Sequence, residues 1–171
     1  TKDKRGKTMF RQMRRFKQLL SEEETYKIID DTMYGVLGVM GEDGYPYTVS
    51  VNHVRDGNKI YFHSAKAGHK NDAIMANPKV SFHFVDKDDI VGEEYTTYFR
   101  SANVFGTATF VEDEEEKVHA FRILCEKTCP EHMHKFEKAM AGSGKNAVVV
   151  RVDIEQMTGK ESLDLMNSRK K

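Results

Sequence analysis

The chain has 171 residues, and its 27 Lys and Arg balance 27 Asp and Glu. The resulting net charge of zero excludes a global field that would draw the protein to nucleic acid or to an anionic membrane surface, so any bound anion must be met by a local site. The sequence has no apolar run long enough to span a bilayer, no apolar signal core near its N-terminus and only two cysteines. We therefore expect a single-domain cytoplasmic protein without a disulfide framework.

The beginning of the chain predicts a basic arm followed by a short helix. Residues 1–20 are rich in Lys and Arg and show no clear period, and we expect them to precede one domain at residues 21–171. Ser21 and Glu24 have the spacing of a capping box, in which each side chain satisfies a free amide of the first turn. This pattern predicts a helix through Asp30.

The rest of the chain alternates between strand-like and helix-like runs. Six runs predict strands, at residues 33–40, 45–54, 59–65, 79–85, 95–111 and 146–154. Helices are expected at residues 68–76, 112–129 and 131–140. The first three strands, separated by short Gly/Asp turns, predict an antiparallel meander; residues 86–94 predict a polar loop, and Gly106 predicts a bulge or bend. We expect an α+β, mainly β fold: a small six-stranded antiparallel barrel with flanking helices.

The segment at residues 62–78 has the pattern of an anion site, because a strand ends, a turn follows and a helix begins within it. The candidate cofactor-binding residues along it are His63, Ser64, Lys66, Gly68, His69 and Lys70. A helix start presents unpaired amides and the positive end of the helix dipole, to which these side chains add charge and donors. The alternative is a plain turn at Gly68 with a solvated Lys70.

This segment is similar to the flavin-phosphate site of the FMN-dependent split-barrel proteins related to pyridoxamine 5'-phosphate oxidase. The resemblance assigns the phosphate to Ser64, His69 and Lys70. The first of the two basic residues is commonly Arg in the oxidases, whereas Gly-His-Lys resembles the nitroimidazole-resistance (Nim-type) branch. Further matches to that branch are MFRQMRR at 9–15, DGYPYTVSVNHV at 43–54, EEYTTYFRSANVFGTA at 93–108 and MTGK at 157–160.

The resemblance also implies where the flavin ring would lie and how the chains would assemble. It implies a split barrel of six antiparallel strands, paired as a two-fold homodimer with two flavins at the interface. The ring would lie along the strand that contains Thr48, Val49, Ser50, Val51 and Asn52. Backbone donors of such a strand suit the pyrimidine edge of the ring, and alternate side chains supply an apolar wall.

Two further roles follow from the same resemblance. Arg100 and Ser101 would reach across the dimer, although an Arg on a strand is about as often part of a surface ion pair. His69, the candidate catalytic residue, would donate a proton near the flavin as well as contact its phosphate, because an ordinary imidazole titrates near neutral pH.

Other cysteines and histidines of the chain have the residue types that bind zinc or haem. Cys125, Cys129, His132 and His134 have the residue types of a zinc site but not the spacing of a compact finger, so we predict no metal and expect Cys125 to be a buried thiol. The strand histidines His53, His63 and His83 are expected to be hydrogen-bonded side chains, one of them near the ligand. Haem needs only one axial histidine, so residue types alone do not exclude it.

The expected function is that of an FMN-dependent reductase, with FAD also compatible because the site recognises the inner phosphate. Electrons would pass to a small aromatic acceptor such as a 5-nitroimidazole. They would come from NAD(P)H or from a separate reduced flavin; the sequence has no G-x-G-x-x-G fingerprint, so a nicotinamide would bind transiently over the flavin ring. The alternative is a flavin- or haem-binding storage or sensor protein without turnover.

Overall fold

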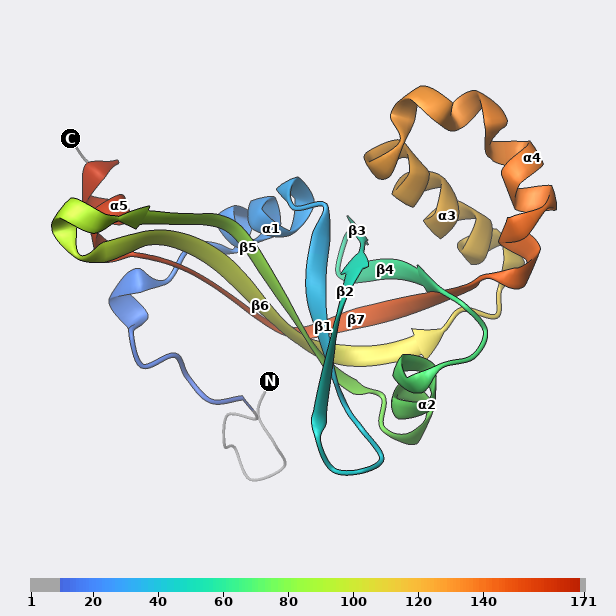
Figure 1. Cartoon of the computed structure of the whole chain (residues 1–171), viewed down its shortest axis with the longest axis horizontal. Helices are drawn as coiled ribbons and strands as arrows, with labels where there is room; N and C mark the ends of the chain where they lie inside the picture. The colour runs from blue at the N-terminus through green and yellow to red at the C-terminus, as the bar shows by residue number, and fades with distance from the viewer. Residues whose placement is uncertain (1–9, 170–171) are drawn as a thin grey trace.

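A curved antiparallel sheet forms the framework of the protein, with helices at its edges and ends (Figure 1). The computed structural model describes residues 10–169, within which the sheet has seven strands in the order β2-β1-β5-β6-β7-β4-β3. The strands are β1 (Tyr34–Met40), β2 (Pro46–Asn52), β3 (Val54–Asp56), β4 (Lys59–Ser64), β5 (Lys79–Val91), β6 (Thr96–Phe110) and β7 (Val148–Glu161). The helices are α1 (Glu22–Asp31), α2 (His69–Ala76), α3 (Glu114–Thr128), α4 (Phe136–Ala141) and α5 (Leu163–Ser168). Short 3-10 helices are η1 (Phe16–Gln18), η2 (Gly92–Glu94), η3 (Pro130–Lys135) and η4 (Ser143–Asn146).

The N-terminal helix α1 has the predicted capping box. The Ser21 hydroxyl accepts from the Glu24 amide at 3.1 Å, and the Glu24 carboxylate accepts from the Ser21 amide at 3.0 Å. The helix buries Ile28 and Ile29 against the sheet. Ahead of it, the amide of Leu20 donates to the carbonyl of Gly159 on β7 at 3.0 Å, so this part of the basic arm lies along the sheet. Residues 1–9 of the predicted arm lie outside the described residues.

The predicted strand at residues 45–54 is two strands, and this accounts for seven strands in place of the expected six. The run is interrupted at His53. The strand before it, β2, forms one edge of the sheet, and the strand after it, β3, forms the other. Both hairpins of the expected meander are confirmed, since β2 pairs with β1 and β3 pairs with β4, but the middle strand is not continuous, and β4 also pairs with β7. A continuous apolar-polar alternation specifies extended backbone but not which neighbour each part of it will find.

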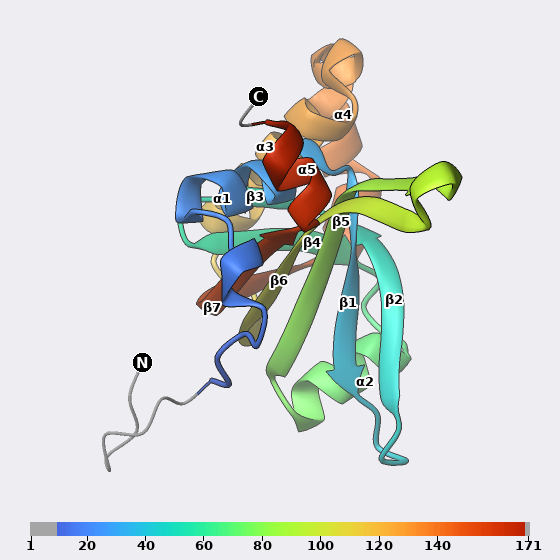
Figure 2. The ribbon, with the colours of Figure 1, turned by 90° about the vertical axis from the view of Figure 1, so that its left-hand side faces the viewer.

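The expected polar loop at residues 86–94 is also wrong, because most of it forms a long hairpin with β6. Residue pairs continue from Lys87 opposite Arg100 to Val91 opposite Thr96, and η2 closes the hairpin. Its tip extends away from the rest of the sheet (Figure 2). Pairing with the β-prone start of β6 supplies backbone hydrogen bonds that local composition does not reveal. The bulge or bend predicted at Gly106 is confirmed as a register shift of β6 against β7, in which the additional residue is Glu155 on β7, opposite Gly106.

Two apolar clusters lie on opposite faces of the sheet. The main core contains Phe62, Phe82 and Phe84 among many aliphatic side chains, and α1 covers part of it. A second cluster holds α3 and α4 against the outer face of β4 and β7 through Tyr61, Val149 and the helix residues. Alternate residues of β4 thus face different clusters, as the pleat requires. Among the described helices, none combines the length and apolar character needed to cross a membrane.

His53 occupies the corner between β2 and β3 and is fully buried. Its Nε2–H donates to the carbonyl of Ile29 at 2.7 Å, and its ring lies 4.6 Å from that of Phe84, measured between centroids. Burial, followed by the charge of Lys127, lowers the pKa of His53 to about 4. The folded protein therefore holds this imidazole neutral.

We expect acid to destabilise the protein through His53. An unfolded histidine titrates near 6.5 and folded His53 at about 4, so between these pH values the unfolded chain binds the additional proton. The free energy of unfolding should fall by on the order of 2 to 3 kcal/mol as the pH decreases through this interval. Above the interval, His53 is neutral in both states and should cause no change of stability with pH. Urea unfolding at pH 7 and pH 4.5 measures the change.

The matched variant is His53→Gln, which retains an N–H donor for Ile29 and does not titrate. The free energy of unfolding of this variant should depend less on pH over the same interval, because residue 53 no longer titrates. Some dependence will remain, because His63 and His83 are present in both proteins. Equal pH dependence in the two proteins would contradict this role for His53.

Candidate functional site

The turn between β4 and α2 is braced by an asparagine. Ser64 ends β4 and is buried, and its hydroxyl donates to Oδ1 of Asn71 at 3.0 Å. The Asn71 amide in turn donates to the carbonyl of Ala65 at 2.5 Å. Sequence reasoning missed Asn71; its position in the first turn of a helix, just after a glycine turn, was the available signal. Because Asn71 holds both ends of the turn, the shape of the turn is set before any ligand binds.

Gly68 lets the chain change direction immediately before α2. Its φ of 137° lies in a region that favours glycine, and an added Cβ would meet no atom within 4 Å, so the constraint is conformational and not steric crowding. The carbonyl of Gly68 accepts from the amides of Asn71 and Asp72. The amides of His69 and Lys70, which precede them, have no backbone acceptor within the described chain. They are the free donors of the helix start.

Lys70 adds a cationic group beside these donors. Its ammonium lies 5.6 Å from the centroid of the Phe62 ring, and burial lowers its pKa. Within residues 10–169, no carboxylate forms an ion pair with it. Lys66 is exposed on the turn, and so is Asp72, whose charge is therefore screened by solvent. The site can accept an anion at Lys70 without first breaking an ion pair.

His69 joins the helix start to β2. Its ring stacks on that of Tyr47, with 4.4 Å between centroids and 25° between planes. Tyr47 lies in the segment at residues 43–54 that resembles the Nim-type branch, and its sequence position alone indicates no role for it. The stack orients the imidazole and brings the start of α2 beside the strand on which the resemblance places the flavin ring.

The predicted ring-binding strand β2 is an edge strand in the described chain, since it pairs with β1 alone. Its residues alternate between the two faces: Thr48, Ser50 and Asn52 are exposed, whereas Val49 and Val51 pack against the main core. The side chain of Val51 therefore points toward the main core. The Asn52 amide donates to the carbonyl of Met33 at 2.9 Å, which leaves Oδ1 available.

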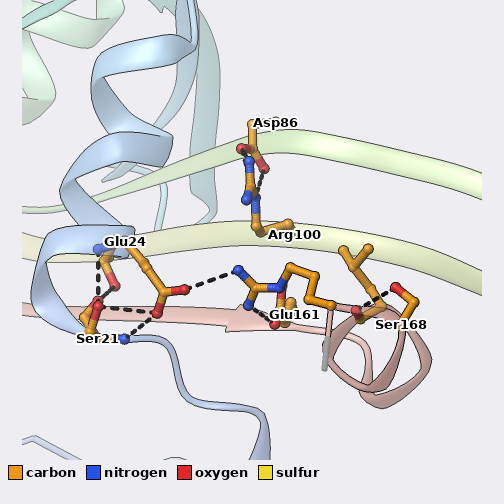
Figure 3. Close-up of polar contacts among 9 residues, drawn as sticks. Ser21, Glu24, Asp86, Arg100, Glu161 and Ser168 are labelled. Atoms are coloured by element: carbon orange, nitrogen blue, oxygen red, sulfur yellow. Dashed lines mark hydrogen bonds and ion pairs between the residues drawn. The ribbon is translucent and has the colours of Figure 1, made fainter. Parts of the chain in front are cut away.

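Arg100 and Ser101 lie away from this turn. The Arg100 guanidinium forms a two-pronged pair with Asp86 at 2.5–3.1 Å (Figure 3), which raises its pKa. Ser101 is buried. In the sheet, Arg100 lies opposite Lys87, near one end of β5, whereas α2 leads into the other end of β5 at Lys79. Within one chain, the structure shows the ion-pair alternative; a reach across a dimer stays a prediction.

The same region of the structure ties down the C-terminal helix. Arg169, which follows α5, contacts Glu24 at 3.1 Å and also pairs with the buried Glu161 at the end of β7 (Figure 3). These ion pairs, with that of Arg100, stabilise the base of the β5–β6 hairpin. Their acceptors are carboxylates of the same chain, and none of these ion pairs involves a residue of the turn between β4 and α2.

The remaining candidates separate by burial. Burial and the nearby charge of Lys70 lower the pKa of His63, which places it next to the α2 turn. Burial also lowers the pKa of His83 on β5. Cys125 and Cys129 are free thiols on and after α3, and burial raises the pKa of Cys125. Within the described residues, no three His, Cys, Asp or Glu side chains gather as a metal site would require.

Comparison with known proteins relates the chain to one family. The family model for pyridoxamine 5'-phosphate oxidase matches residues 21–161. Among curated proteins, none matches the sequence significantly.

Several solved structures share the fold. A proposed 5-nitroimidazole antibiotic resistance protein from Bacteroides thetaiotaomicron is 25% identical, with a TM-score of 0.69 over 84% of this chain and 86% of that one. An FAD-binding protein from Mesorhizobium loti is 23% identical, with a TM-score of 0.64 over 85% and 97% of the two chains. The flavocytochrome Anf3 from Azotobacter vinelandii is 19% identical, with a TM-score of 0.75 over 94% and 74%.

Proposed function

The chain belongs to the pyridoxamine 5'-phosphate oxidase family, and on that basis we propose that it is a flavin-dependent reductase that passes electrons to a small aromatic acceptor such as a 5-nitroimidazole. The observation that carries the proposal is the turn between β4 and α2, where amides and a lysine that have no partner within residues 10–169 lie together, as a site for an anion would require. The acceptor class is supported by the Gly-His-Lys sequence at residues 68–70 and by the similarity to the Bacteroides protein.

The residues of this turn fit a flavin phosphate. Lys70 supplies a positive charge, and the amides of His69 and Lys70 supply donors along the helix dipole; the Ser64 hydroxyl would contact the phosphate only by turning its proton away from Asn71. FMN is the proposed cofactor; FAD carries the same inner phosphate, and the Mesorhizobium relative is described as FAD-binding. When bound, the flavin supplies the redox chemistry.

The chain's own residues would position the flavin ring and protect it. The free backbone edge of β2 offers donors and acceptors along residues 48–52, and the Tyr47–His69 stack lies where this strand meets the phosphate turn. His69 would contact the phosphate and could deliver a proton to the acceptor. NAD(P)H or a separate reduced flavin would serve as donor, the nicotinamide stacking transiently over the ring.

A flavin- or haem-binding protein without turnover is the second candidate, because the flavocytochrome has the same fold over most of this chain. The absorbance spectrum of the purified protein separates the two cofactors: bound oxidised flavin shows its visible maxima, and haem shows a Soret band. Anaerobic reduction with NADH or NADPH, with and without a nitroaromatic compound, then separates an enzyme from a binding protein.

We expect a homodimer in solution. The edge strand β2 leaves backbone groups unpaired, and large side chains such as Tyr45, Ile90 and Tyr95 are largely exposed within the described chain. A partner chain that covered this edge, with a flat flavin ring between the two chains, would remove such groups from solvent. Sedimentation of the flavin-loaded protein at micromolar concentration should report twice the mass of one chain; a monomer that retains its flavin would contradict the dimer.

Lys70→Ala should weaken flavin binding. The variant removes a charge-assisted contact to the phosphate, of a kind worth roughly 1.5 to 3 kcal/mol, so the flavin dissociation constant should rise by about ten- to a hundredfold. Fluorescence titration of the flavin at physiological salt measures it. The matched control is Lys79→Ala, which removes an exposed lysine just beyond the other end of α2 and should leave affinity unchanged. If the two variants bound flavin with equal affinity, the proposed phosphate site would be wrong.

His69→Arg should retain or tighten flavin binding, because a guanidinium carries a permanent charge and a planar fork matched to phosphate oxygens. Single-turnover oxidation of the reduced protein by a nitroimidazole, measured in parallel, tests the second role. A slower reaction with flavin still bound would support proton donation, since a guanidinium does not act as an acid near neutral pH. Unchanged rates from pH 6 to 8 would eliminate it.

A further inference from the structure

A cavity of about 480 Å³ lies between the outer face of β4 and the helices α3 and α4. Figure 1 shows these helices grouped at one end of the sheet, above β4 and β7. The volume is within the range of small-molecule pockets. The floor of the cavity includes His63 from β4 and Asn52 from the end of β2, and its roof includes Phe121 and Met140.

The lining of this cavity carries no formal charge. In a chain of which 32% is Asp, Glu, Lys or Arg, none of these residue types occurs among the described residues that line it. Most of the lining is apolar, and Cys125, Cys129 and Met140 add polarizable sulfur atoms that adapt to a flat ring. A charged ligand would lose part of its hydration here and would find no counter-ion among the lining residues; Lys70, whose charge acts on His63, lies outside the lining.

Two polar side chains converge on the cavity from the sheet. Asn52 uses its amide N–H on Met33, which leaves Oδ1 as an acceptor. His63 faces α3, with its ring 6.1 Å from that of Phe121, and it remains solvent-accessible; partial burial and, second, the charge of Lys70 lower its pKa, which favours the neutral imidazole. A neutral imidazole has one donor and one acceptor. The lining thus combines an apolar enclosure with hydrogen-bonding groups on one wall.

We propose that this cavity binds an uncharged, flat aromatic molecule whose polar substituent is hydrogen-bonded by His63 and Asn52. His63 directly precedes Ser64 of the phosphate turn, so the cavity adjoins the proposed flavin site. The inference therefore deepens the proposed function: the bound molecule would be the electron acceptor, and that role, although not the binding itself, rests on the proposed reductase activity.

The test compares 4-nitrobenzamide with 4-nitrobenzoate, which have nearly the same shape but differ in charge. Calorimetric titration of the full chain as purified, with bound flavin quantified by absorbance, should show the neutral amide binding at least about tenfold more tightly than the anion. Equal or tighter binding of the anion would overturn the proposed ligand class.

Two alanines of α4 provide a matched pair of variants. Ala139 and Ala141 are both exposed, but Ala139 lines the cavity and Ala141 does not. Ala139→Phe should weaken binding of 4-nitrobenzamide at least about tenfold by occupying the cavity, whereas Ala141→Phe should change it less than about twofold. If Ala139→Phe bound 4-nitrobenzamide as tightly as the wild type, the proposed site would be wrong. If it lost flavin as well as the probe, the proposal would also be wrong, because the cavity would then hold the cofactor itself.

His63→Leu is a second, independent variant, since it keeps the apolar enclosure and removes the hydrogen bond. It should weaken binding of 4-nitrobenzamide roughly five- to tenfold; unchanged affinity would overturn the assigned contact. Failure of the proposed function is scored separately. If the purified protein neither carries nor takes up flavin, the reductase proposal fails, while the two probes and the variants still decide whether the cavity binds a neutral aromatic molecule.

Discussion

The corner at His53 is the constraint on which the arrangement of the sheet depends. One residue separates β2 from β3, yet these strands form opposite edges of the seven-stranded sheet within the described chain. The sheet must therefore curve until its edges approach each other at this point. A fully buried imidazole, hydrogen-bonded to the carbonyl of Ile29 on α1, occupies the corner. Its neutral state is required there, because a buried charge without a counter-ion is costly.

The curvature also assembles the candidate site. It places the end of β2 near β4, so that Asn52 and His63 line one cavity although they belong to strands that do not pair. At the other end of β2, Tyr47 stacks on His69 at the start of α2. A strand with a free backbone edge, an anion site at a helix start and an apolar cavity are thereby brought together on one side of the molecule. In a chain with no net charge, this local grouping is how an anionic cofactor would be attracted.

The arginines at the base of the β5–β6 hairpin are paired with carboxylates. Arg100 is bound by Asp86 and Arg169 by Glu24 and Glu161, at the base of the β5–β6 hairpin. Lys70 differs from them, because no carboxylate of the described chain pairs with it and its pKa is lowered by burial. A lysine held partly out of solvent without an anion is poised to gain most from one.

The sequence by itself determined the features that depend on neighbours a few residues apart. The capping box of Ser21 and Glu24, the turn at Gly68 with α2 after it, and the bulge at Gly106 each follow from local backbone chemistry, and each is present. Only the tertiary structure decided which strands pair: it divided residues 45–54 between two edges, extended β5 through a run that resembles a loop, and gave Arg100 its carboxylate partner. Tyr47 belongs to the same class, because its contact with His69 joins segments that composition does not relate. The physical reason is that strand pairing and burial are settled between residues far apart in the chain, whereas caps, turns and helix starts are settled within a single turn of backbone.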